Sequence, residues 1–146
     1  MRYNQLMSVE IKGKYEGDLR VQLTHGPSGS VIETDAPVDN QGKGSRFSPT
    51  DLTVASLGAC MMTIMGIVAR RDGIKLEDAT FRAEKHMSEN PRRIGKIVLE
   101  FNMPPNMTED QKKKLEKAAH TCPVHHSLLS EIEKDIKFVY PTKVEK

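Results

Sequence analysis

The residues best able to do chemistry in this chain are its two cysteines, Cys60 and Cys122. A thiolate is a strong nucleophile and a ligand for soft metals, whereas a buried, protonated cysteine is an inert packing residue. Cys60 follows the segment SPTDLTVASLGA, and Cys122 stands directly before PVHHSLL. The two cysteines therefore have different local settings, and each setting predicts its own reactivity.

Cys60 lies in the middle of an apolar helix that we expect to begin at Ser48-Pro49 and to end at Asp72-Gly73. Inert packing is one interpretation of this cysteine. The mid-helix position receives nothing from the helix dipole, so a reactive thiolate would need a nearby cation. Helical spacing places Cys60 on a stripe of small hydroxyl residues, Thr53, Ser56 and Thr63, and the arginines that could supply the cation are Arg20, Arg46, Arg92 and Arg93.

Cys122 precedes Pro123, a residue typical of the first position of a helix. The thiol is then at or near a helix N-cap, where unpaired amides favour a thiolate. Local electrostatics alone make Cys122 the better candidate for a thiol of low pKa. Its histidine neighbours, His120, His125 and His126, also allow a Cys/His metal site, although no CxxC or HxxxH spacing accompanies them.

The elements that must position these cysteines are strands and helices in partly segregated order. Three antiparallel strands are expected in QLMSVEIKGKY, DLRVQLTHG and SVIETDAP, before the long helix. A strand hairpin, a helix in MTEDQKKKLEKAAH, a helix in VHHSLLSEIEKD and a short strand IKFVY follow. This order predicts the α+β class. The length suits a single domain over residues 1–146.

Composition excludes several classes of protein. The net charge of +2 and the absence of tryptophan give no basic, aromatic-interleaved surface, so we expect no nucleic-acid partner. We find neither a signal peptide nor a membrane-spanning run, and therefore expect a cytoplasmic protein with no membrane partner. In that compartment two cysteines are expected to be free, metal-bound or redox-active.

The segments SPTDLTVASLGAC and CPVHHSLL, in this order, resemble the OsmC/Ohr family of osmotically inducible and organic hydroperoxide resistance proteins. TDAPVDNQGKGSRFSPTDL and NPRRI resemble its less characterised OsmC-like members. The resemblance spans nearly the whole chain. It implies an intertwined homodimer in which antiparallel sheets wrap central helices. The family's activity is thiol-dependent peroxide reduction.

By this resemblance Cys60 is the peroxidatic thiol and Cys122 the resolving thiol, joined in a disulfide after turnover. No bound cofactor is implied, and the reductant is an external dithiol of the lipoyl type. Organic hydroperoxide reductases of the family carry a glutamate after the helix-starting proline, bonded to an arginine that activates the peroxidatic thiol. Here Thr50 has that place and Asp51 follows. Arg20 and Asp51 are therefore our candidates for thiolate-activating support, with helix capping as the other role for Asp51.

Three functions follow as hypotheses. The first is an enzyme of oxidative stress defence, a thiol peroxidase that reduces organic hydroperoxides. The second is a redox-sensing or thiol–disulfide protein with little peroxidase turnover. The third is a small-molecule or metal-binding module built on the Cys/His cluster near Cys122.

Overall fold

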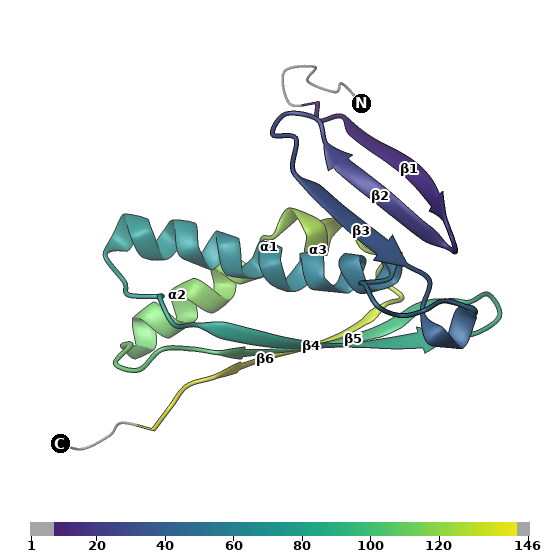
Figure 1. Ribbon diagram of the computed structural model, residues 1–146. Coiled ribbons are helices and arrows are strands. Elements are labelled where there is room, and N and C mark those ends of the chain that lie inside the picture. Colours follow the sequence, from purple (N-terminus) through teal and green to yellow (C-terminus); the bar gives the residue numbers. More distant parts are fainter. Residues whose placement is uncertain (1–7, 143–146) are drawn as a thin grey trace. The chain divides into compact units, whose positions relative to one another are not determined.

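The computed structural model describes residues 8–142. These fall into two compact units, and the first unit ends at Leu52 and the second begins at Thr53. The prediction of one domain over residues 1–146 stays a prediction. The part of the expected first strand before Ser8 lies outside the described residues. Figure 1 shows the helices and strands of both units.

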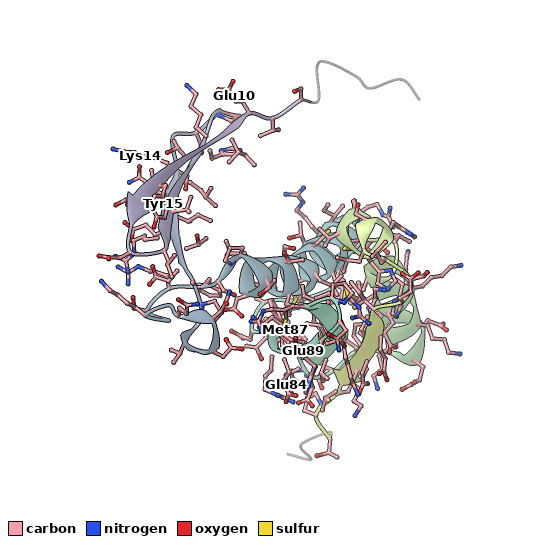
Figure 2. All side chains as sticks on the ribbon, turned by 90° about the vertical axis from the view of Figure 1, so that its right-hand side faces the viewer. Glu10, Lys14, Tyr15, Glu84, Met87 and Glu89 are labelled. Carbon is pink, nitrogen blue, oxygen red and sulfur yellow. The ribbon has the colours of Figure 1, made fainter. Side chains whose placement is uncertain are left out.

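The first unit is an antiparallel meander of three strands, as predicted: β1 (Ile11–Gly17), β2 (Arg20–His25) and β3 (Val31–Asp35). A short 3-10 turn, η2 (Val38–Asn40), follows. Alternation along the paired strands gives the sheet one apolar face, formed by Ile11, Tyr15, Val21, Leu23 and Ile32. Much of this face is open, since Ile11 is 64% and Tyr15 63% exposed. Figure 2 labels Lys14 and Tyr15 on β1, whose side chains alternate between the polar and the apolar face.

The long helix α1 (Pro49–Asp72) has the bounds that the sequence predicts. Ser48 and Asp51 cap its start reciprocally, and Gly73, with φ of 67°, follows its end. The most apolar 18-residue window of α1 has a mean hydropathy of 2.0. By length and composition alone, this helix could cross a membrane. A single helix of this kind is weak evidence for a membrane protein, because the core helix of a soluble protein has the same composition.

The second unit packs helices on a three-stranded sheet of order β4-β5-β6. Its strands are β4 (Thr80–Ser88), β5 (Arg93–Asn102) and β6 (Glu133–Val139), and its further helices are α2 (Glu109–Ala119) and α3 (Pro123–Ser127). Figure 1 shows α1 and α2 on the same face of this sheet, and Figure 2 labels Glu84 and Met87 on β4. The buried core lies between them and includes Leu57, Met61 and Met65 of α1, Ile97, Leu99 and Phe101 of β5, and Leu115 of α2.

Two predictions for this unit are corrected. β6 pairs with β5 in parallel, so the sheet is mixed and not antiparallel throughout. The helices between β5 and β6 carry the chain back along the sheet face before β6 begins, which makes the two strands parallel. The second expected helix is only five residues long, because the backbone is already extended at Leu128, with φ −86° and ψ 146°. The capping box of Thr108 and Gln111 at the start of α2 is confirmed.

Candidate functional site

Cys60 lies half-buried on α1, eleven residues after the helix begins at Pro49. Two hydroxyl residues of the stripe around it, Ser56 and Thr63, donate within the helix. Ser56 Oγ donates to the carbonyl of Thr53 at 2.7 Å, and Thr63 Oγ1 donates to the carbonyl of Ala59 at 2.8 Å. Because a hydroxyl has one proton, both are used within the helix itself.

Gly58 fixes how closely α1 approaches the sheet. A Cβ at this position would lie closer than 3.0 Å to the ring of Phe81 on β4. Only a residue without a side chain allows this approach, two positions before Cys60. The Phe81 ring therefore supports the helix backbone next to the cysteine, and the sequence alone gave no signal for this contact.

Cys122 is the N-cap residue of α3, as predicted, and Pro123 opens the helix. Its side chain is fully buried, with an exposed fraction of 0%. The backbone N–H of His125 donates to Cys122 Sγ at 3.3 Å, and the N–H of Cys122 donates to the carbonyl of Ala119 at 3.3 Å. A backbone amide of α3 thus holds the Cys122 sulfur, and the last residue of α2 holds the Cys122 backbone.

The fold brings the two thiols together across 62 positions of sequence. Both cysteines are free, and Cys60 packs against the buried core that contains Cys122, near enough for its thiol to act on the pKa of Cys122. Burial raises the pKa of the Cys122 thiol, the neighbouring Cys60 raises it further, and the His125 N–H offsets only part of this. The expected low pKa of Cys122 is therefore wrong: the N-cap is present, but burial outweighs its local effect.

The three histidines near Cys122 form a cluster of ring contacts. The rings of His120 and His125 meet edge to face with centroids 5.9 Å apart, and those of His125 and His126 are 6.0 Å apart. Burial lowers the pKa of His125, and the charges of Lys134, His120 and His126 lower it further. Within residues 8–142, no group of three or more His, Cys, Asp or Glu side chains is arranged to hold a metal ion.

Arg20 is fixed within the first unit by partners that the sequence reasoning missed. Its Nε and Nη2 donate to the two carboxylate oxygens of Asp35 at 2.7 and 2.9 Å, and Ser45 Oγ accepts from Nη2 at 3.0 Å. Asp35 is 2% exposed, and its hydrogen bonds with Arg20 and Ser45 hold its pKa well below the ordinary range. The cross-strand register, which places Arg20 opposite Asp35, was the signal that could have identified this pair.

Asp51 caps α1: it accepts the backbone N–H of Ser48 at 2.9 Å. The capping role considered from the sequence is thus confirmed. The other candidate arginines also have partners. Arg46 Nε lies 3.2 Å from Glu33, and Arg93 donates to the carbonyls of Glu89 and Pro91. Arg20 and Cys60 belong to different units, and the thiolate-supporting roles of Arg20 and Asp51 stay predictions.

Comparison with solved structures places this fold among known ones. A protein from Psychrobacter arcticus, described as a putative osmotic stress induced and detoxification response protein, matches with a TM-score of 0.86 and 37% identity, over 95% of this chain and 100% of the other. An organic hydroperoxide resistance protein OsmC from Legionella pneumophila matches with a TM-score of 0.69 at 18% identity, over 92% and 98% of the two chains. The second similarity concerns the fold alone.

Sequence comparison agrees with this. An uncharacterised protein of Acinetobacter baylyi is 29% identical over 111 residues, which is 74% of this chain and 77% of the relative. The family model described as OsmC-like protein matches residues 42–137, a range that contains α1, both cysteines and the whole sheet β4-β5-β6 apart from its last two residues. The chain is a member of the OsmC-like protein family.

Proposed function

We propose that the protein is a thiol-dependent peroxidase that reduces organic hydroperoxides in oxidative stress defence. The observation that carries this proposal is that Cys60 packs against the core cluster containing Cys122, within one compact unit. A disulfide needs two cysteines whose Cα atoms lie within about 7 Å, and neighbouring cysteines are the arrangement that such a bond requires. Family membership, and the name of the hydroperoxide resistance protein that shares the fold, support the same chemistry.

The different exposure of the two thiols supports a different role for each. Cys60 is half-buried and lies on a helix surface, whereas Cys122 is completely buried and its pKa is raised. A peroxide reaches the more accessible sulfur first, and only a thiolate attacks it efficiently. Cys60 is therefore the peroxidatic residue, and Cys122 is the resolving thiol.

In the first step the Cys60 thiolate attacks one peroxide oxygen. A sulfur–oxygen bond forms and the oxygen–oxygen bond breaks, while the alkoxide takes a proton and leaves as an alcohol. Cys60 is oxidised by two electrons to a sulfenic acid. Ile64, one turn after Cys60 on α1, is apolar and only partly buried, and it favours an organic peroxide over a small polar one.

In the second step Cys122 attacks the Cys60 sulfur. A disulfide bond forms, the sulfur–oxygen bond breaks, and the released hydroxide combines with the Cys122 proton to give water. An external dithiol of the lipoyl type then reduces the disulfide by exchange and is itself oxidised to a cyclic disulfide. No bound cofactor takes part in this cycle.

The protein is further proposed to act as a homodimer in the cytoplasm. Among the described residues up to Leu52, the buried side chains are polar: Thr34, Asp35 and Ser48. The apolar sheet face of this unit instead borders an open cavity of about 450 Å³ lined by Ile11, Leu23 and Ile32. Ile67 of α1 is 50% exposed as well. A second copy would remove these apolar surfaces from water.

The test is turnover of cumene hydroperoxide with dihydrolipoamide as reductant. The wild-type protein is expected to consume peroxide catalytically, and Cys60→Ser to consume none. Cys122→Ser is the matched variant: it is expected to consume one equivalent and to leave a sulfenic acid that dimedone traps. Catalytic turnover retained by Cys60→Ser would overturn the assignment.

A redox-sensing role is a second candidate, favoured by the raised pKa of Cys122. A resolving thiol that remains protonated at neutral pH forms the disulfide slowly, as suits a sensor that responds once. Single-turnover and steady-state rates separate the two functions. A sensor forms the Cys60–Cys122 disulfide with one equivalent of peroxide but does not cycle when dihydrolipoamide is supplied.

A further inference from the structure

A continuous row of aromatic rings crosses the second unit. It starts on α3, passes the end of α2, and continues across all three strands of the sheet β4-β5-β6 in the order β6, β5, β4. Successive ring centroids are 5.1 to 6.1 Å apart. The rings, in order, are those of His126, His125, His120, Phe138, Phe101 and Phe81.

The row touches both cysteine segments. On β4, the Phe81 ring lies against Gly58, two residues before Cys60. On α3, His125 supplies the N–H that donates to Cys122 Sγ. The two sulfurs that must meet are therefore carried by backbone segments resting on the same row.

We propose that His125 and His120 are positioning residues for the step in which Cys122 attacks oxidised Cys60. The ring of His125, seated against His120, keeps the His125 amide on the Cys122 sulfur. This inference rests on the proposed peroxidase function and adds to it two residues that touch neither the peroxide nor the reacting sulfur through their side chains.

The shortness of α3 makes this support necessary. A helix of five residues has few backbone hydrogen bonds of its own, and His126 N–H to the Cys122 carbonyl, at 3.2 Å, is one of them. Such a turn keeps its place mainly through side-chain contacts. His120 in turn packs edge-on against Phe138 of β6, with centroids 6.1 Å apart, so the contact reaches the rigid sheet.

The amide matters because Cys122 must lose its proton while it attacks. Burial and the facing Cys60 thiol from α1 both disfavour the thiolate, and the His125 N–H is a hydrogen bond that stabilises it. Losing a hydrogen bond to a charged group typically slows a step that depends on it by about tenfold or more. If the ring no longer holds α3, the amide moves and this stabilisation is lost in the transition state.

The charges around His125 add a pH dependence. The charges of Lys134 from β6, His120 from the end of α2 and His126 from α3 act on its ring, and the rings of the two histidines contact it. Near neutral pH the His125 ring is uncharged and packs well. Protonation in acid would add a positive charge that Lys134 and the neighbouring histidines repel, and would loosen the contact.

The test measures the two steps separately in single-turnover experiments. Dimedone trapping gives the rate of Cys60 sulfenic acid formation, and non-reducing mass spectrometry gives the rate of disulfide formation. In His125→Ala we expect disulfide formation to slow by about tenfold or more, the effect of losing such a hydrogen bond, and sulfenic acid formation to change less than about twofold. His120→Ala should slow the same step by a smaller factor.

Two variants act as controls. His125→Phe keeps a ring against His120 and is expected to restore disulfide formation and to weaken its decline in acid. His86→Ala removes an exposed histidine of β4 outside the row and should change neither step.

Disulfide formation at the wild-type rate in His125→Ala would overturn the inference. If that variant fails to fold by thermal melting, the exposed His120→Ala decides, and an unchanged rate there overturns it too. Absence of both sulfenic acid and disulfide in the wild-type protein would instead overturn the proposed function, so the two failures are distinguishable.

Discussion

The two cysteines lie on helices that are stabilised in different ways. Cys60 lies on a helix of 24 residues whose backbone is fixed by its own hydrogen bonds and by the core. Cys122 caps a helix of five residues, held in place by its neighbours. Yet the thiol with the more favourable local setting, at a helix N-cap, is the buried one with the raised pKa. Tertiary burial, and not position in a helix, decides which sulfur is available for reaction.

The strongest test of this difference between Cys60 and Cys122 is the rate at which each thiol is alkylated. At pH 7.5 iodoacetamide is expected to modify Cys60 about a hundredfold faster than Cys122, because Cys122 is inaccessible and its pKa is raised. Peptide mass spectrometry over a time course measures both rates in one sample. The unfolded protein in urea is the control, in which the difference should shrink to a few-fold. Faster labelling of Cys122 in the folded protein would reverse the two roles.

A pair of glycine substitutions in α1 tests the support of Cys60. Gly58→Ala should destabilise the protein by roughly 1–3 kcal/mol, since the new methyl group overlaps the Phe81 ring. Gly66→Ala is the matched control: its methyl would meet Leu76 at 3.9 Å, an ordinary contact. That change should stabilise the helix by about 0.5–1 kcal/mol. Urea unfolding gives both values, and equal effects of the two changes would contradict the close approach of Phe81.

A third test asks whether Arg20, in the first unit, affects the reactivity of Cys60, in the second unit. If Arg20 supports the Cys60 thiolate, Arg20→Ala should slow alkylation of Cys60 at pH 7 by about tenfold, because the pKa of the thiol would rise. Lys43→Ala, which removes an exposed cation of the same unit, serves as control and should leave the rate within a factor of about two. A rate unchanged in Arg20→Ala would confine that residue to its contacts with Asp35 and Ser45.

Acid should cause a small loss of stability through His125, which lies next to Cys122. The pKa of His125 is lowered from its ordinary 6.5, so the folded state binds fewer protons than the unfolded state just below that pH. This contribution to stability is complete above pH 6.5 and is lost as the pH falls through the lowered pKa. Thermal melting between pH 7.5 and 5 should show a smaller loss in His125→Phe than in the wild-type protein. Parallel curves for the two proteins would show that His125 contributes nothing.

Several features of the fold could be predicted from the sequence because they depend on nearby residues. Ser48, Pro49 and Gly73 mark the ends of α1 by their own backbone and side-chain chemistry. Thr108 and Gln111 start α2 in the same way, and Pro123 marks Cys122 as an N-cap. Each of these signals lies within four residues of the element that it determines.

Other features depended on contacts between distant segments. The parallel pairing of β6 follows from the path of α2 and α3 across the sheet, and the extended backbone at Leu128 ends α3 earlier than its apolar residues indicated. The pairing of Arg20 with Asp35 required the exact strand register, which a change of one residue would destroy. These outcomes result from competition between segments, which local propensity does not describe.

The sequence by itself determined where the helices begin, which residues bear thiols, and the family to which the pattern belongs. Only the tertiary structure decided that the two cysteines are neighbours, that Cys122 is buried with a raised pKa, and that one row of rings lies against both segments. The physical reason is that a cap is a matter of one helical turn, whereas the solvation of a thiol depends on every segment packed around it.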